Sequence, residues 1–335
     1  MEPIYQQIMA AIGPDGTLPG NFRVKTTGMD RRTMILDEGP LAGKEIHYAE
    51  GALDGITYYH GSGSQDEALL EGLQEVILLA AKEQQFEDAL EKLHNCFEEH
   101  DGMLGCVDGL QEWIFEHKDE LNLSVLFHLS CTLLTDSCRI GEVKYALSVL
   151  ELFAGAEGEW RDHVRTLALS DEFTLFCVFV ANQWENKSEE LFAMARNTRG
   201  WGRVHAVREL EPTTQEMKDW LLDEGWDNDV MPAYTAKACA EKGGLLWDRL
   251  SQPMDRTQLD AAGGLVLALL EEGPVRNISV MEDGLAILMA YLAQVQWAKP
   301  DFSDQDRQVV QEIVERTEAD SQLGKRARQV MELLS

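Results

Sequence analysis

From about residue 64 to the C-terminus, apolar residues recur at intervals of three and four positions, which places them along one face of an α-helix. Leu69, Leu73, Val76 and Ile77 form one such stripe. Segments that alternate apolar and polar residues, as a half-buried strand does, hardly occur in this region. The pattern therefore predicts a long succession of short amphipathic helices.

These helices are expected to form antiparallel pairs, and the clearest pair spans residues 200–225. Its two helices are separated by Glu211-Pro212-Thr213, because a helix does not continue through a proline. Successive pairs repeat about every 30 to 40 residues, within the range of HEAT-like helical repeats. No residue pattern recurs strictly, so an irregular all-α domain stays open as the alternative. The other expected helices cover residues 64–81, 86–97, 107–116, 121–134, 143–153, 160–169, 173–183, 189–197, 231–241, 245–250, 259–272, 280–295, 305–318 and 323–334.

Residues 1–63 follow a different pattern and are expected to form an N-terminal cap, with residues 64–335 as the HEAT-like helical-repeat domain. A short amphipathic helix is followed by turn-forming stretches rich in glycine and proline. Short extended segments are predicted after them, at residues 22–26, 33–36, 45–48 and 56–60. The predicted fold class is therefore all-α, an irregular HEAT-like α-hairpin array with a small β-containing N-terminal cap.

The chain is strongly acidic, and this narrows the classes of partner. Its 335 residues hold 29 Lys and Arg against 59 Asp and Glu, a formal net charge of −30. Such a charge repels phosphate backbones and anionic lipid surfaces, so we expect a protein partner rather than nucleic acid or a membrane. No stretch approaches the roughly 20 apolar residues that span a bilayer, and the start lacks a secretory signal. With six cysteines in no close pair, these features predict a cytoplasmic protein with reduced thiols.

The sequence offers no ligand set for a metal or a cofactor. None of the eight histidines forms an HxxxH or HExxH pair, and the Glu-x-x-His match at Glu91 and His94 has no second copy on a neighbouring helix. Loops of the GxxxxGK[ST] or GxGxxG kind, which bind nucleotides, do not occur. We therefore expect no metal and no cofactor.

The stretch Gly61-Ser62-Gly63-Ser64 precedes the first helix of the expected array. Free backbone N–H groups at a helix start can hold an anion, while a flexible joint between cap and array is the alternative. Ser64 and Glu67 also have the spacing of a capping box, which predicts that the helix begins at Ser64.

Basic residues gather at one place against the acidic background. Such a cluster can hold an acidic peptide or a phosphate through bidentate contacts. The alternative is a structural role, in which the arginines bond to carboxylates and carbonyls of the adjacent repeat. The candidate partner-binding residues are Arg199, Trp201, Arg203, His205 and Arg208.

Two segments resemble known proteins. The residues GWGRVHAVREL at 200–210, with Pro212 and a second helix at 216–222, resemble a HEAT-type repeat that carries an arginine on its concave-facing helix. Together with EGALDGI at 50–56, they also resemble a family of uncharacterised bacterial proteins, some of which carry the name limonene hydroxylase. The resemblance implies a helical-repeat fold. Hydroxylation would require haem, non-haem iron or flavin, and the sequence shows no ligand set for any of them.

Three functions follow as hypotheses. The first is a non-catalytic scaffold or adaptor that binds another protein on a helical-repeat surface. The second is an enzyme with its site at the junction of the cap and the first helices, where Asp54 and His60 are the acid–base candidates. The third is a HEAT-like DNA-repair-type protein similar to alkylpurine DNA glycosylases, although the acidic balance opposes the basic groove that DNA needs.

Overall fold

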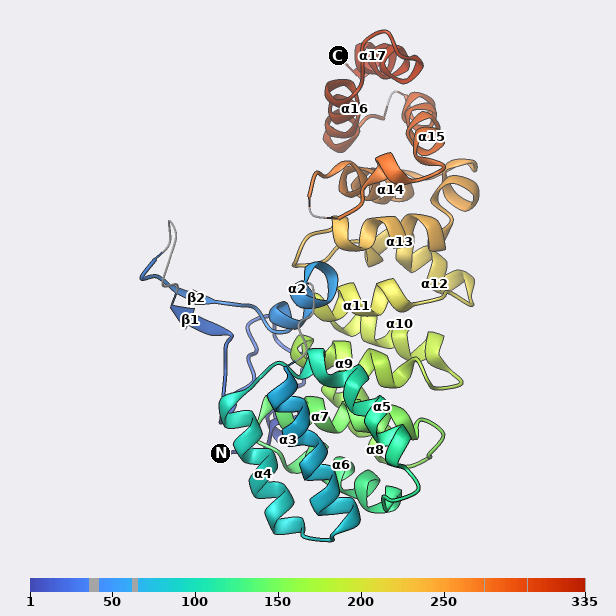
Figure 1. The fold of residues 1–335 in the computed structure, drawn as a ribbon. Coiled ribbons are helices and arrows are strands. Elements are labelled where there is room, and N and C mark those ends of the chain that lie inside the picture. Colours follow the sequence, from blue (N-terminus) through green and yellow to red (C-terminus); the bar gives the residue numbers. More distant parts are fainter. Residues whose placement is uncertain (36–41, 62–65, 274, 300, 335) are drawn as a thin grey trace. The chain divides into compact units, whose positions relative to one another are not determined.

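Helices dominate the computed structural model, which describes residues 1–35, 42–61, 66–273, 275–299 and 301–334 (Figure 1). One antiparallel two-stranded sheet lies near the N-terminus of this described part. The prediction of an all-α fold with a small β-containing N-terminal part is confirmed. The six cysteines are all free, and several are buried among apolar side chains.

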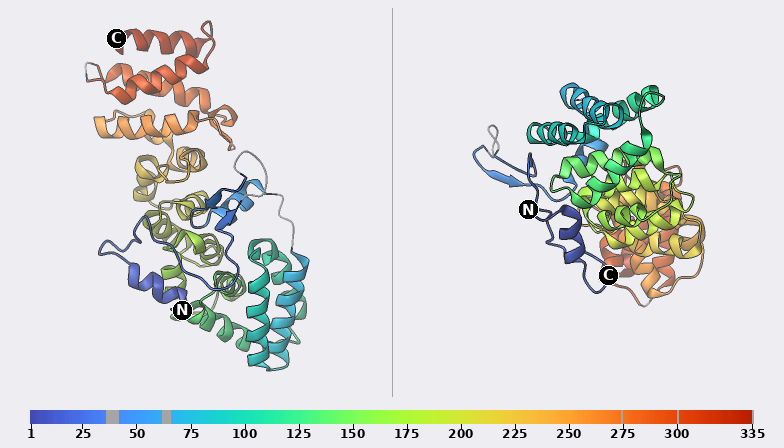
Figure 2. Two further views of the ribbon diagram at one scale, coloured as in Figure 1. Left: turned by 90° about the vertical axis from the view of Figure 1, so that its left-hand side faces the viewer. Right: turned by 90° about the horizontal axis from the view of Figure 1, so that it is seen from below.

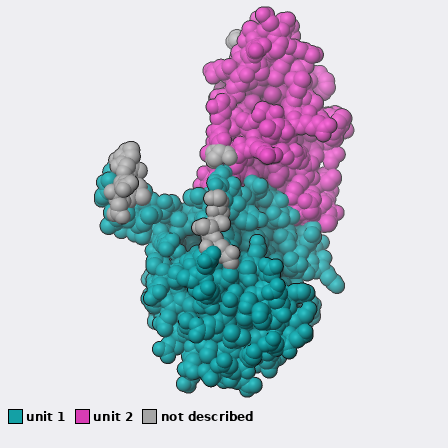
Figure 3. All heavy atoms as spheres, viewed as in Figure 1, with its two compact units in different colours: residues 1–209 teal, residues 210–335 magenta. Residues whose placement is uncertain are grey.

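Contacts within the chain divide it into two compact units, residues 1–209 and 210–335 (Figure 3). Unit 1 contains two strands and the first group of helices. They are α1 Ile4–Ala11, β1 Thr33–Ile35, β2 Glu45–His47, α2 Ala52–His60, α3 Glu67–Ile77, η1 Leu78–Lys82, α4 Phe86–Glu99, η2 Met103–Cys106, α5 Val107–His117, α6 Leu123–Asp136, α7 Ile140–Leu150, η3 Glu151–Phe153, α8 Trp160–Leu167, α9 Asp171–Ala181, α10 Lys187–Asn197 and α11 Trp201–Glu209.

In unit 2, the described elements are all helices, joined by turns and loops. Its elements are α12 Gln215–Trp220, η4 Leu221–Gly225, α13 Ala233–Gly243, η5 Leu245–Leu250, α14 Arg256–Leu270, η6 Ile278–Val280, α15 Gly284–Trp297, α16 Asp304–Arg316 and α17 Gln322–Leu334. Helices α16 and α17 lie side by side, as the left view of Figure 2 also shows. The η1, η4 and η5 segments are π-helical. Every helix expected from residue 86 onward has a helical counterpart, while the assignment to HEAT-like repeats stays a prediction.

The first helix of the expected array begins differently from the capping-box prediction. Ser64 lies outside the described residues, as do Ser62 and Gly63. The side chain of Asp66 caps α3, because its carboxylate accepts a hydrogen bond from the backbone N–H of Leu69 at 3.0 Å. The predicted division at residues 63 and 64 also falls among the residues that are not described, and it stays a prediction.

Residues 56–60, which were predicted to be extended, are helical and belong to α2. The aromatic and β-branched residues Ile56, Thr57, Tyr58 and Tyr59 favour a strand by propensity, but packing overrides that preference. Tyr59 stacks against Trp201, with ring centroids 6.1 Å apart. A helix brings this side chain to α11, and tertiary contact decides the local structure.

Residues 22–26, also predicted to be extended, pair with no strand in the described part of the chain. Side chains satisfy this backbone instead. The N–H of Val24 donates to Glu50 Oε1 at 2.8 Å, and its carbonyl accepts from Arg32 Nη2 at 2.9 Å. The remaining predicted pieces form β1 and β2, in which Thr33 pairs with His47 and Met34 with Ile46. Leu36, the end of one predicted piece, lies outside the described residues.

The core of unit 1 is built around α7 and α9, which pack against each other. Residues 173–180 are apolar on almost every side, and α9 is buried along nearly its whole length. Residues 285–292 of α15 are also mostly apolar, but Leu285 at the start of this stretch is exposed. Across the described residues, no helix combines the length and hydropathy needed to cross a bilayer.

A buried carboxylate organises the middle of unit 2. Asp306, with no exposed side-chain surface, accepts two hydrogen bonds from the Arg256 guanidinium at 2.7 and 2.9 Å. It also accepts from the Tyr291 hydroxyl at 3.3 Å and closes the capping box at the start of α16 with Ser303. Three helices, α14, α15 and α16, are thereby joined at one carboxyl group.

We predict that Arg256→Met lowers the free energy of unfolding by about 3–5 kcal/mol, because it leaves the Asp306 carboxylate buried without a cation. Chemical denaturation of the full chain measures the change. Arg316→Met is the matched control, since Arg316 pairs with Glu312 and Glu272 at the surface and such pairs contribute about 0–1 kcal/mol. Equal losses in the two variants would contradict the assignment.

Candidate functional site

Two glycines let α2 lie directly against α9 and α11. Gly51, just before α2, has a φ of 69°, and a Cβ there would lie 2.2 Å from the carbonyl oxygen of Asp171. A Cβ on Gly55 would lie 2.2 Å from Cε3 of Trp201. Any larger residue at either position therefore collides with its neighbour. The structure brings together the segments EGALDGI and GWGRVHAVREL, which are far apart in the sequence and together carry the resemblance described above.

Arg32 and Glu50 connect the chain segment before α2 to the start of α9. Arg32 is 3% exposed, and its guanidinium bonds to Asp30 Oδ1 at 2.8 Å and to Glu50 Oε1 at 2.6 Å. The other oxygen of Glu50 accepts from the Ser170 hydroxyl at 2.8 Å, directly before α9. Burial, reinforced by the negative charge of Glu172, raises the pKa of Glu50 even though Arg32 opposes this.

A lysine on α7 forms the second half of the same ionic network. The ammonium of Lys144 donates to Asp54 Oδ2 at 2.5 Å and to Glu172 Oε1 at 2.6 Å, and the lysine side chain is only 6% exposed. Glu172 also accepts from the backbone N–H of Gly51 at 3.0 Å. Three elements, α2, α7 and α9, therefore meet at one cation.

These contacts keep the lysine charged. Burial alone would lower the pKa of Lys144, but the negative charges of Asp54 and Glu172 outweigh burial and raise it. A lysine with a raised pKa is protonated near neutral pH and is not a nucleophile. Burial raises the pKa of Asp54, which Lys144 opposes and Glu172 reinforces, so Asp54 holds its proton more tightly than an exposed aspartate.

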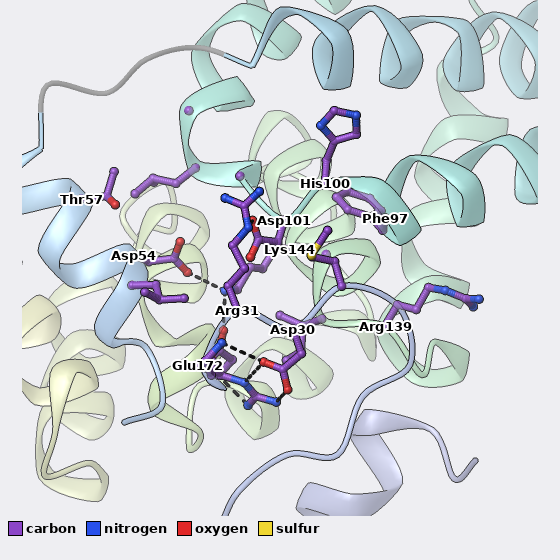
Figure 4. A pocket seen from close by; sticks show the side chains of 18 of the residues that line it. Asp30, Arg31, Asp54, Thr57, Phe97, His100, Asp101, Arg139, Lys144 and Glu172 are labelled. Atoms are coloured by element: carbon purple, nitrogen blue, oxygen red, sulfur yellow. Dashed lines mark hydrogen bonds and ion pairs between the residues drawn. The ribbon is translucent and has the colours of Figure 1, made fainter. Parts of the chain in front are cut away.

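A pocket of about 520 Å³ opens above this network (Figure 4). The residues before β1, helix α2, the loop after α4, and helices α7 and α9 all contribute to its wall. Asp54 projects from α2 toward the middle of the pocket. The apolar part of the lining consists of Met29, Leu53, Phe97, Leu104 and Ile140. Its size lies within the range of pockets that hold small molecules, about 300–1,000 Å³.

The lining also carries a more accessible ion pair. Arg31, whose side chain is 60% exposed, lies 3.2 Å from Asp101 Oδ1. Burial raises the pKa of Asp101, and the positive charges of Arg31 and Lys144 only partly offset this. Next to it, His100 Nδ1 lies 2.6 Å from Asp66 Oδ2. The pocket thus presents both charged groups and apolar side chains.

Of the predicted acid–base pair, Asp54 and His60, only Asp54 is among the residues that line the pocket. Asp54 lines the pocket, whereas His60 is exposed at the end of α2 and is not among the lining residues. The residues that accompany Asp54 instead are Lys144 and Glu172. Both stand within largely apolar helical stretches, and charged residues are rarely buried unless they are paired. That isolated position of Lys144 and Glu172 is the sequence signal that could have identified them.

The candidate partner-binding cluster has mixed exposure. Arg203 is 5% exposed, and its Nε donates to the carbonyls of Thr198 at 2.8 Å and Ala195 at 3.1 Å. Trp201 and His205 are also buried. These three side chains support the turn before α11 and its packing, while Arg199 and Arg208 are exposed. Partner binding by this cluster stays a prediction, and a partner would reach the two exposed arginines.

His205 belongs to the contact between α2 and α11. Its Nδ1 lies 2.9 Å from the Tyr59 hydroxyl, and the Arg208 guanidinium lies 4.3 Å from the centre of the same tyrosine ring. Burial, with a smaller contribution from the positive charge of Arg208, lowers the pKa of His205 to about 3. The imidazole is therefore neutral near pH 7 and does not act as a cationic contact for an acidic partner.

No protein-family model matches this chain, and neither the curated proteins nor the solved structures include a similar one. Within the described residues, no three His, Cys, Asp or Glu side chains lie close enough together to hold a metal ion.

We predict that Gly55→Ala destabilises unit 1 by about 1–3 kcal/mol, because the added methyl group would overlap the Trp201 ring. Chemical denaturation of the full chain measures the loss. Gly20→Ala is the control, since a Cβ at Gly20 meets no atom within 4 Å. A Gly55→Ala variant as stable as this control would show that α2 does not pack against α11 as described.

Proposed function

We propose that unit 1 binds a small polar molecule in the pocket between the N-terminal segment and helices α2, α7 and α9. The observation that carries this proposal is the position of the Lys144–Asp54–Glu172 network, which forms the floor of a cavity of about 520 Å³. Burying charged side chains costs folding free energy, and replacing a buried ion pair by apolar residues often leaves protein stability unchanged or raises it. Stability alone is therefore a weak reason for this network. Polar groups that converge on a cavity with an apolar lining are the usual form of a ligand site.

The geometry favours binding over catalysis. Lys144 is held as a charged ammonium between two carboxylates, which leaves it no role as a nucleophile or a base. His60, the proposed proton carrier, does not line the pocket. Within an enzyme hypothesis, Asp54 would be the proton donor, because its raised pKa suits an acid. No reaction is assigned to the pocket on this basis.

A scaffold that binds another protein is the second candidate, and unit 2 supplies the observation in its favour. Trp247 on η5 is 69% exposed, and Trp297 on α15 is 71% exposed. These two elements pack against each other. Tryptophan contributes more than most residues to protein interfaces, and large aromatic side chains are seldom left in solvent to this extent. A DNA-repair-type function has no comparable support, because the net charge of −30 opposes DNA.

We predict that Gly102→Phe abolishes ligand binding by filling the pocket. Gly102 lines it, and a Cβ there would meet no atom within 4 Å, so the ring can enter the cavity without displacing backbone. A ligand-observed NMR screen of small polar compounds tests this. Gly155→Phe is the matched control, since Gly155 is exposed, has equal space and does not line the pocket. Hits that bind the Gly102→Phe variant equally well would refute the pocket.

For the scaffold, we predict that Trp247→Ala combined with Trp297→Ala abolishes capture of a specific protein from native cell lysate. The Gly102→Phe variant should retain the same protein, because its change lies in unit 1. Quantitative mass spectrometry of the captured fractions makes the comparison. Identical protein sets for wild type and the double variant would rule out these tryptophans as the interface.

A further inference from the structure

We infer that the ligand of this pocket is a small organic cation with an ammonium or guanidinium group on a short hydrocarbon body. This inference rests on the proposed function, and it adds the chemical class of the ligand. Three independent features of the pocket support it: the pairing of its basic side chains, the oxygens that its carboxylates leave open, and its apolar lining.

Each basic side chain that lines the pocket already has a carboxylate partner. Arg31 pairs with Asp101, and Lys144 with Asp54 and Glu172. The remaining two are also paired, Arg32 with Asp30 and Glu50, and Arg139 with Glu98 and Glu142. An anionic ligand that bound the buried Arg32 or Lys144 would have to displace one of these carboxylates. Desolvated charges separated from their partners are strongly unfavourable, so the pairing disfavours an anion.

The carboxylates that line the pocket, in contrast, do not all accept hydrogen bonds at both oxygens. Five of them line the pocket, and both oxygens of Asp30, Asp66 and Glu172 are engaged by side-chain or backbone donors. Lys144 donates to Asp54 through Oδ2 alone, and Arg31 contacts Asp101 through Oδ1 alone. Within the described residues, no other residue donates a hydrogen bond to the second oxygen of either group. A ligand with N–H donors would complete both.

The charge balance of the connected network agrees with this pattern. It contains four carboxylates, Asp30, Glu50, Asp54 and Glu172, and two cations, Arg32 and Lys144. The separate pair of Arg31 and Asp101 adds no net charge. Two negative charges are therefore in excess in a region largely shielded from water. An added cation would reduce their repulsion, and charge-assisted hydrogen bonds to it would be stronger than neutral ones.

The remaining lining residues indicate the chemical character of the uncharged part of the ligand. Thr57 lies one helical turn after Asp54 on α2, so its hydroxyl stands on the same side of the pocket (Figure 4). The five apolar residues already named would contact methylene groups. A volume of about 520 Å³ holds a small molecule, while a folded partner would not enter it.

The test compares compounds built on a four-carbon chain in three charge forms: 1,4-diaminobutane and its guanidinium derivative agmatine as cations, 1,4-butanediol as the neutral form, and succinate as the anion. Isothermal titration calorimetry measures binding to the full-length protein. We expect the cations to bind at least tenfold more tightly than the diol or succinate. Asp54→Asn and Asp101→Asn should each weaken cation binding tenfold or more, and Gly102→Phe should abolish it.

The outcomes separate the two proposals. Binding of the diol or succinate that Gly102→Phe removes, without binding of the amines, would overturn the cationic ligand and keep the pocket. Absence of binding by all three charge forms would overturn the cationic ligand, and a failed NMR screen would overturn the pocket as well. Amine binding that neither aspartate variant changes would also contradict the inference. Circular dichroism of both variants, with Gly155→Phe as a further control, excludes misfolding as the cause of any loss.

Discussion

The arrangement of helices in the N-terminal half of this protein depends on the ion pairs that the Lys144 ammonium forms with Asp54 and Glu172. A lysine with 6% of its side chain exposed must be paired, and its two partners come from different helices, α2 and α9. The ammonium therefore fixes where α2 lies. Gly51 and Gly55 make that position sterically possible, because each stands where a side chain would collide with its neighbour. Electrostatics and close packing thus select the same arrangement.

The need of buried polar groups for partners also explains how the N-terminal segment is held in place, although its described residues form one sheet of two short strands. Around Val24, the backbone groups are satisfied by Glu50 and Arg32 instead of by a neighbouring strand. Arg32 also bonds to Asp30, so one guanidinium joins three parts of the segment. Buried backbone polar groups need partners, and ionised side chains provide them here. The segment becomes a wall of the pocket, whereas β1 and β2 have mostly exposed side chains and form none of its lining.

The excess of acidic residues has a more specific meaning in the pocket than in the composition. Over the whole chain, a net charge of −30 is sufficiently explained by a well-solvated surface. In the pocket, however, each cation is already paired with at least one carboxylate, and Asp54 and Asp101, each with one oxygen that receives no hydrogen bond from another described residue, line the cavity. The arginines around Trp201 illustrate the opposite case. Arg203 is prominent in the sequence as a cation, yet its buried Nε bonds to carbonyls that end a helix.

The sequence by itself determined most of the helices, because a period of three to four apolar positions depends only on neighbouring residues. It also singled out the segments that contain Asp54 and Trp201. It assigned residues 56–60 to a strand, since propensity is local while the contact of Tyr59 with α11 is not. Only the tertiary structure decided the site. Asp54, Lys144 and Glu172 are separated by 90 and 28 residues, and no local pattern specifies which distant carboxylates will surround a buried amine. That choice is made when helices pack, because only then does the cost of leaving the charge unpaired arise.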